Sequence, residues 1–317
     1  MSPAAPIRVA YVGAGAMIRE HARAFADIPG VRQAGIWNRT RGKAERLAHE
    51  FGIEAVASSL AALYEQSVAD LVVIAVYETA IRETVEACIG FPWTILMEKP
   101  VGLDLHEARA IEAQAASRKA RVMVGLNRRA LSSTRAALDD VAADPSPRFI
   151  HVQDQQSLAL ARRIGHAAPV IRNWMYANSI HLVDYLLAFG RGEIDSVEVI
   201  SPWTPEDPGV VLAKVGFASG DLGLYEAQWR GPGPWACAVT THRRRWEMRP
   251  LEKAAFQNLD ERVLNAVEPA ASDTRFKPGL RQQAEEVVRV CRGFASRVPD
   301  LREGVRAMQL VQQIYRC

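Results

Sequence analysis

The sequence predicts an α/β protein in which a doubly wound parallel sheet precedes an α+β domain with a large, open and mostly antiparallel sheet. The first third of the chain alternates short, continuously apolar runs with helical stretches, which is typical of parallel strands covered on both faces. Beyond about residue 145 the apolar runs lie closer together and are separated by hairpin-type breakers such as Ala218-Ser219-Gly220-Asp221. A length of 317 residues with 49% apolar residues suits two domains, predicted at residues 1–125 and 126–317.

Five strands separated by helices are predicted in the first domain. The strands are Ile7–Val12, Val31–Trp37, Asp70–Val76, Trp93–Met97 and Arg121–Gly125. Helical spacing is found over residues 16–26, 42–51, 79–88 and 104–117. The last of these helices begins with Asp104 and Glu107, three residues apart, which resembles a capping box.

The second domain is predicted to contain a sheet with helices on one face. Its candidate strands are Phe149–Gln155, Ile194–Ile200, Val210–Phe217, Leu222–Trp229 and Trp235–Thr241. The leucine-rich run Ile180–Phe189 is a helix among them. The tail from Leu280 to Tyr315 is predicted as two amphipathic helices split near Pro299, and these could pack back on the first domain.

Composition argues against several classes of protein. The net charge of +3 is too small to indicate a nucleic-acid partner, and no apolar run approaches the ~18 residues of a membrane span. The N-terminus lacks the basic start and apolar stretch of a signal peptide. The cysteines Cys88, Cys237, Cys291 and Cys317 are scattered and form no CxxC pair. We therefore expect a reduced, cytoplasmic protein with free thiols.

A glycine-rich turn after the first strand predicts a nucleotide site. Gly13 permits a tight turn, and Gly15 lets the backbone approach a pyrophosphate at the start of the helix that begins with Ala16 and Met17. Ile18 stands where the third glycine of the fingerprint usually lies. The alternative, a plain structural turn, is less favoured because the turn follows the first strand of a βαβ array. This arrangement predicts a Rossmann domain.

The tip of the second strand indicates which dinucleotide is bound. An NAD-specific site usually has Asp or Glu here for the ribose hydroxyls, whereas this chain has Asn38, Arg39 and Thr40. The planar guanidinium of Arg39 suits a 2′-phosphate. We therefore expect NADP in preference to NAD, the alternative being a solvated basic loop.

A lysine follows the fourth predicted strand, in the sequence Glu98-Lys99-Pro100. The proline ends the strand and biases Lys99 toward an extended conformation. The ammonium then projects out of the carboxyl edge of the sheet, into the region where α/β proteins bind ligands. A lysine that only snorkels at a strand end is the alternative.

Together with two later segments, these motifs resemble the Gfo/Idh/MocA oxidoreductase family. The later segments are Gly125-Leu126-Asn127-Arg128-Arg129 and Ile180-His181-Leu182-Val183-Asp184, and Phe276-Lys277-Pro278-Gly279 also looks like that family. The resemblance covers nearly the whole chain. It implies a Rossmann domain, a C-terminal sheet domain, NAD(P)-dependent redox chemistry on a sugar or cyclitol, and homodimers or homotetramers formed through the sheet.

The resemblance also implies roles for particular residues. Lys99 would lie beside the nicotinamide and stabilise an alkoxide at the reacting carbon, and Glu98 would seat the lysine or the nicotinamide ribose. His181 would move the substrate proton. Asp184, one helical turn later, would orient the imidazole or bind a hydroxyl. The imidazole and the Lys99 amine, from different domains, are expected to meet across one crevice.

The resemblance also implies further contacts. Asn127 and Arg128 lie just past the last Rossmann strand, in a region that by resemblance faces the cofactor and the substrate. Val76 and Asn127 are assigned to the cofactor, and Arg128 and Asn178 to the substrate. Arg129 could instead tie the domains together. His181 and Asp184 offer two metal ligands, but no third is evident nearby, so no metal site is predicted. His181 as an ordinary buried histidine is the alternative.

The chain departs from the family at two places. Many members carry an Asp four residues before the histidine, and this chain has Ala177 there. The usual Pro-x-x-x-His after the third strand is replaced by residues 76–81, Val-Tyr-Glu-Thr-Ala-Ile. These differences leave open a non-catalytic NAD(P)-binding sensor or partner subunit, or a reductase of the same fold that acts on a non-sugar substrate.

Several arginines and aromatic residues of the second domain are ambiguous. The run Arg243-Arg244-Arg245 is interpreted as a solvated strand edge. Three other arginines precede the histidine helix and could receive an anion or lie in solvent: Arg162, Arg163 and Arg172. Trp174 and Tyr176 are expected in the core rather than as a platform for a sugar.

Overall fold

The computed structural model describes residues 5–206 and 208–316, and these form two compact units. The first unit comprises Met1–Asn127 and Arg275–Val305, and the second comprises Arg128–Thr274 and Arg306–Cys317. The chain therefore enters the first unit twice, and the last helix, α12 (Leu301–Tyr315), contributes residues to both.

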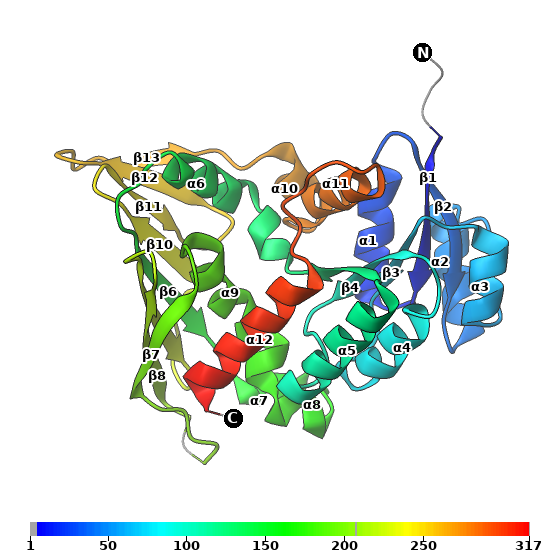
Figure 1. Cartoon of the computed structure of the whole chain (residues 1–317), viewed down its shortest axis with the longest axis horizontal. Coiled ribbons are helices and arrows are strands. Elements are labelled where there is room, and N and C mark those ends of the chain that lie inside the picture. Colours follow the sequence, from blue (N-terminus) through cyan, green and yellow to red (C-terminus); the bar gives the residue numbers. More distant parts are fainter. Residues whose placement is uncertain (1–4, 207, 317) are drawn as a thin grey trace. The chain divides into compact units, whose positions relative to one another are not determined.

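The first unit contains a five-stranded parallel sheet in the order β2-β1-β3-β4-β5 (Figure 1). Its strands are β1 (Ile7–Val12), β2 (Val31–Trp37), β3 (Leu71–Ile74), β4 (Thr94–Glu98) and β5 (Arg121–Gly125). The predicted strands are confirmed, with shifts of one or two residues at the ends of β3 and β4. β3 is apolar throughout, and β1 is apolar except for Arg8, because helices cover both faces of the sheet.

The helices of this unit follow the predicted alternation, with one addition. They are α1 (Ala16–Ala26), α2 (Arg41–Phe51), α3 (Leu60–Ser67), α4 (Ile81–Cys88), α5 (Leu105–Arg118) and α11 (Leu280–Cys291). The short α3 was not predicted. α1, α2 and α11 share one hydrophobic core with the sheet, centred on Tyr11, Phe25 and Val287. α4 and α5 pack against each other (Figure 1).

The capping box before α5 is confirmed. The Asp104 carboxylate accepts a hydrogen bond from the Glu107 backbone N–H at 2.9 Å. The Glu107 side chain reaches back and accepts from the N–H of Leu103 at 2.7 Å. Two donors at the start of the helix are thus satisfied by side chains, which fixes where α5 begins.

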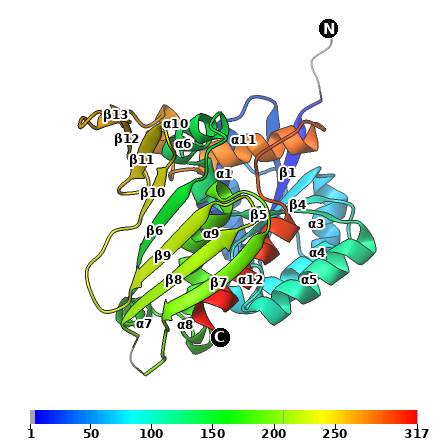
Figure 2. The ribbon, with the colours of Figure 1, turned by 60° about the vertical axis from the view of Figure 1, so that its left-hand side comes forward.

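The second unit contains an eight-stranded sheet in the order β13-β12-β11-β10-β6-β9-β8-β7 (Figure 2). All its strand pairs are antiparallel except β6 with β9. The strands are β6 (Phe149–Gln155), β7 (Ile194–Ser201), β8 (Val210–Phe217), β9 (Leu222–Gln228), β10 (Ala236–Thr240), β11 (Arg244–Met248), β12 (Ala254–Asn258) and β13 (Asn265–Val267). The first five confirm the predicted set, whereas the last three were not predicted.

One face of this sheet carries α9 (Ile180–Phe189), which packs on β6, β9 and β10 (Figure 2). A π-helix, η3 (Met175–Ser179), leads directly into α9. The shorter helices are α6 (Ser132–Ala142), α7 (Leu158–Arg163), α8 (Ala168–Arg172) and α10 (Ala271–Arg275); 3₁₀ turns lie at η1 (Glu78–Ala80) and η2 (Asn127–Ala130). α9 is hydrophobic nearly all round, which agrees with its almost complete burial.

Candidate nucleotide and active site

The glycine turn between β1 and α1 has the conformation that a dinucleotide site requires. Gly13 has φ +112°, and an added Cβ would lie 2.2 Å from the carbonyl oxygen of Ala75. Gly15 is the N-cap of α1, no side chain caps it, and an added Cβ there would meet no atom within 4 Å. A pyrophosphate therefore fits over Gly15, where the first N–H groups of α1 lack partners within the helix.

The residues at the tip of β2 form a short loop whose expected role in cofactor binding stays a prediction. The Asn38 amide donates to the carbonyl oxygen of Thr40 at 2.9 Å and so closes the loop. Arg39 is exposed and makes no ion pair with the residues that the structure describes. Arg41, in contrast, is paired with Glu45 at 2.8 Å. Arg39 is therefore the basic side chain of this loop that a cofactor can recruit without breaking an existing pair.

The segment after β3 carries an exposed aromatic residue at the same edge of the sheet. Val76 is half-buried, and Tyr77, which precedes the turn η1, is 76% exposed. Ala75 is the residue whose carbonyl oxygen approaches Gly13. Because β1 and β3 are neighbours in a parallel sheet, Val76 and the glycine turn lie at one edge.

Glu98, at the end of β4, belongs to a buried pair that the sequence did not predict. Its carboxylate lies 2.7 Å from Nε2 of His21, which is 1% exposed on α1. Gly125 on β5 leaves space for the Glu98 carboxyl group, because an added Cβ at Gly125 would lie 3.2 Å from that group. A histidine on the core-facing side of an amphipathic helix, one turn after Ile18, is the signal that could have indicated a buried partner.

The charges around Glu98 keep it ionised. Burial alone would raise the pKa of its carboxyl group, but the hydrogen bond and charge of His21, with the charges of Lys99 and Lys277, lower the pKa overall. Lys99 itself is half-buried immediately beyond the strand. An ionised carboxylate next to this lysine favours its ammonium form by Coulomb attraction.

The predicted residues of the second unit gather at the start of α9. His181 is 8% exposed, and its ring centroid lies 6.0 Å from that of Trp235. The guanidinium of Arg128 lies 5.7 Å from the Trp235 ring and donates to Glu252 at 2.6 Å. The half-buried Trp235 therefore lies close to both His181 and Arg128, and sequence reasoning did not select it as a site residue.

Asp184 forms an ion pair with Arg129 that the sequence did not predict, and its expected role beside the imidazole or a substrate hydroxyl stays a prediction. Both of its carboxylate oxygens accept from the Arg129 guanidinium at 2.7 Å, and Asp184 is 1% exposed. Such a bidentate pair is rigid. It joins Arg129 of η2 to α9, and both residues belong to the second unit.

Asn178 and a buried acid form a polar network beside η3. Oε1 of Gln156 accepts from the Asn178 amide and the Trp174 indole, both at 2.8 Å. Asp154 on β6 accepts from Gln156 at 2.6 Å and from the Tyr225 hydroxyl at 2.7 Å. Burial raises the pKa of Asp154 to about 6, although these hydrogen bonds oppose the shift. Sequence reasoning did not select Asp154 as a functional residue.

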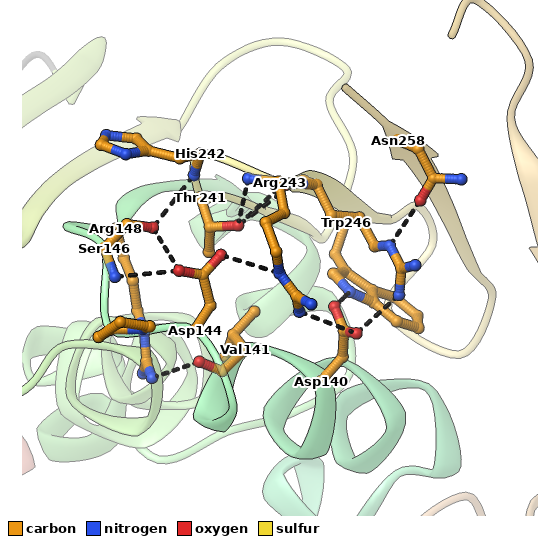
Figure 3. Close-up of polar contacts among 12 residues, drawn as sticks. Asp140, Val141, Asp144, Ser146, Arg148, Thr241, His242, Arg243, Trp246 and Asn258 are labelled. Carbon is orange, nitrogen blue, oxygen red and sulfur yellow. Dashed lines mark hydrogen bonds and ion pairs between the residues drawn. The ribbon is translucent and has the colours of Figure 1, made fainter. Parts of the chain in front are cut away.

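The interpretation of Arg243-Arg244-Arg245 as a solvated strand edge was wrong. β11 is an internal strand, and Arg243 and Arg244 form ion pairs with Asp140 near the end of α6, Arg244 at 2.6 Å (Figure 3). Asp144 accepts from Arg243 and from Ser146, and hydrogen bonds from Ser146 and Thr241 hold the pKa of Asp144 well below its usual range. The run therefore has a structural role.

The remaining candidate residues of the second unit are either buried aromatic residues or exposed arginines. Trp174 and Tyr176 are 9% and 2% exposed, which confirms the core interpretation. The arginines of α7 and α8 are exposed and stay undecided: Arg162, Arg163 and Arg172. Cys88, Cys237 and Cys291 are free, and Cys317 lies outside the described residues.

The predicted site residues thus fall into two groups, one in each unit. The nucleotide group is in the first unit, where β1, β3 and β4 are adjacent and their carboxyl ends share an edge: Gly13, Gly15, Ala16, Met17, Val76, Glu98 and Lys99. Asn127, the last residue of Met1–Asn127, donates to the carbonyl oxygen of Pro278 at 3.0 Å. The second-unit group is Arg128, Asn178, His181 and Asp184.

The described residues 5–206 and 208–316 contain neither a candidate metal site nor a candidate membrane-spanning helix. No group of three histidine, cysteine or acidic side chains in these ranges could hold a metal ion. In the same ranges, no helix is long and apolar enough to cross a membrane.

Comparison with known proteins agrees with the fold and with the glycine turn. Residues 7–126 match the family model described as Gfo/Idh/MocA, "Oxidoreductase family, NAD-binding Rossmann fold". Inositol 2-dehydrogenase of Rhizobium meliloti (strain 1021) is 28% identical over 137 residues, which is 42% of this chain and 41% of that protein. The match thus spans less than half the length of this curated relative.

Two solved structures show that the likeness in fold extends to the second unit. A dehydrogenase from Chromobacterium violaceum has a TM-score of 0.83 at 18% identity, covering 98% of this chain and 95% of the other. Levoglucosan dehydrogenase, solved with NADH and levoglucosan, has a TM-score of 0.81 at 17% identity, covering 98% and 96%. The chain therefore has a Rossmann domain that matches the NAD-binding model of the Gfo/Idh/MocA oxidoreductases over residues 7–126.

Replacing His21 with Leu should destabilise the protein by about 3–5 kcal/mol, because the buried Glu98 charge would lose its partner. The Glu98 pKa is lowered, so its contribution to stability is present above the usual carboxyl range and is lost as pH falls. Urea denaturation at pH 7 measures the effect. His49→Leu, at an exposed position of α2, is the matched control. Equal losses for the two variants would contradict the prediction.

Replacing Asp154 with Asn should remove a pH dependence of stability. Because the folded pKa is raised from 3.8 to about 6, Asp154 stabilises the fold most below pH 4 and loses that contribution as pH rises to 6. The loss corresponds to about 3 kcal/mol. Urea denaturation from pH 4 to 7 should show this step in the parent and in Asp195→Asn, an exposed control on β7, but not in Asp154→Asn. A step that persists in Asp154→Asn would disprove the assignment.

Proposed function

We propose that this protein is an NAD(P)-dependent dehydrogenase or reductase that transfers a hydride to or from a sugar, cyclitol or sugar derivative. The observation that carries the proposal is the position of Lys99. This residue follows β4 at the carboxyl edge of the sheet, and the Gly13 turn follows β1 at the same edge. The inositol and levoglucosan dehydrogenases among its relatives support a polyol or sugar as the substrate class.

Lys99 has the chemistry to bind the reacting oxygen. A cationic ammonium beside that oxygen stabilises the alkoxide that develops as hydride leaves or arrives. The ionised Glu98 favours the cationic form of Lys99, and His21 holds Glu98 in place. When bound, the nicotinamide supplies the hydride donor or acceptor.

His181 is proposed to move the substrate proton. An imidazole titrates close to neutral pH, so it can accept a hydroxyl proton during oxidation and return one during reduction. Asp184 lies one helical turn after His181 on α9. Its bidentate pair with Arg129 fixes α9 at that point and thereby stabilises the helix that carries His181. We assign Asp184 to this positioning task, and Arg128 and Asn178 to substrate contact.

A second function remains supported by two residues. Ala177 is buried in η3 where many family members carry Asp, and Tyr77 stands in the segment that replaces their Pro-x-x-x-His. Both features favour a non-catalytic NAD(P)-binding sensor or partner subunit. A same-fold reductase of a non-sugar substrate is the other candidate. Homo-oligomer formation and a cytoplasmic location stay predictions from the sequence.

Lys99→Ala should lower kcat by roughly 10²- to 10³-fold, because one electrostatic stabiliser of the transition state is lost. His181→Asn should lower kcat by roughly 10²-fold or more and flatten its pH profile near neutrality. Turnover on a panel of polyols, sugars and non-sugar alcohols is followed at the absorbance of reduced nicotinamide.

NADH binding should survive in both variants and in the exposed control Lys253→Ala, which should also keep its turnover. A parent protein that binds NADH without turnover on any compound would establish the sensor function instead. Unchanged turnover in Lys99→Ala would remove Lys99 from the mechanism.

Arg39→Ala should reduce the preference for NADP over NAD by roughly 10- to 100-fold, because a guanidinium–phosphate pair of this kind corresponds to about 1.5–3 kcal/mol. The dissociation constants of NADPH and NADH, measured by fluorescence, give this ratio. Arg46→Ala, an exposed arginine on α2, provides the control. A parent protein that strongly prefers NADH would disprove the expected specificity.

A further inference from the structure

The segment Phe276-Lys277-Pro278-Gly279 lies at the carboxyl edge of the first unit's sheet, far along the chain from the glycine turn. Gly279 has φ +82°, and an added Cβ would lie 2.2 Å from the carbonyl oxygen of Asn127. The Asn127 side chain in turn donates to the carbonyl oxygen of Pro278 at 3.0 Å. These contacts fix the segment to the residues that follow β5, so its position is determined by the sheet.

The ammonium of Lys277 is held over the start of α1. Its Nζ lies 2.9 Å from Sδ of Met17, the second residue of that helix. A thioether sulfur is a weak acceptor, whereas an ammonium carries three strong donors. Among the described residues Lys277 makes no ion pair, and its side chain is exposed. An anion at this position would be a much stronger partner than the sulfur.

The charged groups near Lys277 also favour a bound anion. The buried carboxylate of Glu98 feels the charges of His21, Lys99 and Lys277. The first turn of α1 contains no acidic residue, and its N-cap Gly15 offers no side chain to its N–H groups. Lys99 and Lys277 therefore both act on this one carboxylate, and Lys277 also lies beside the N-terminus of α1, an arrangement that favours a bound anion.

We propose that Lys277 is a binding residue for the pyrophosphate of the dinucleotide, which it contacts at the N-terminus of α1. The inference uses the NAD-binding character of the first unit and does not depend on the chemistry under Proposed function. It adds a cationic side chain to a phosphate site otherwise made of backbone N–H groups. Lys277 also lies outside residues 7–126, the range that the family model covers.

The test compares nucleotide binding by the parent, Lys277→Gln, Lys277→Arg and Lys119→Gln. Lys119 is an exposed lysine that follows α5, and therefore lies toward the opposite edge of the sheet. The dissociation constant of NADH is measured by nicotinamide fluorescence, and those of ADP-ribose and adenosine by competition. ADP-ribose keeps the pyrophosphate without the nicotinamide, whereas adenosine lacks all phosphates.

Lys277→Gln should weaken NADH and ADP-ribose binding by roughly 10- to 100-fold, as expected for one charge-assisted hydrogen bond. Adenosine binding should change less than about twofold, Lys277→Arg should retain most of the affinity, and Lys119→Gln should behave like the parent. The melting temperature of each variant reports whether it folds.

Three results would overturn the proposal. Unchanged affinity for ADP-ribose in Lys277→Gln would exclude a phosphate contact. A fall in kcat with unchanged NADH affinity would show that Lys277 serves the reacting oxygen instead. Equal weakening of adenosine would show a disturbed fold. Absence of turnover in the parent would count against the proposed dehydrogenase activity, and the binding measurements would still decide the role of Lys277.

Discussion

The first unit depends on one buried electrostatic pair, the contact between His21 and Glu98. A carboxylate with 8% exposure is unfavourable unless hydrogen bonds and opposite charges compensate its lost hydration. His21 provides both from the helix whose N-terminus faces the nucleotide site. The pair therefore links two parts of that site, the start of α1 and the Glu98-Lys99 segment after β4.

The second unit uses acidic side chains in contrasting ways. The buried Asp184 and the half-buried Asp140 are bound by arginines, and Asp184 is held in a bidentate pair that locks α9. Asp154 accepts from neutral donors, Gln156 and Tyr225, so burial dominates and its pKa rises to about 6. The difference follows from the partner: a guanidinium compensates a buried charge far better than a hydroxyl or an amide does.

Local pattern was sufficient for most elements of the fold. Continuous apolar runs correctly predicted the five parallel strands. Apolar runs separated by hairpin breakers correctly predicted the first five strands of the second sheet. β11 was missed because its apolar residues, Trp246 and Met248, alternate with charged side chains, and β12 and β13 are short, with five and three residues. The run of three arginines was misread for a different reason: its acidic partners Asp140 and Asp144 lie about 100 residues earlier.

The sequence by itself determined the class of fold, the tight turn at Gly13, and the position of Lys99 after a buried strand. These features depend on periodicity and on backbone restrictions that act over a few residues. Only the tertiary structure decided which polar groups are partners, such as His21 with Glu98, or Lys277 with the start of α1. Those pairs join residues 77 and 260 positions apart. Their energies arise from burial and charge in three dimensions, which no local pattern encodes.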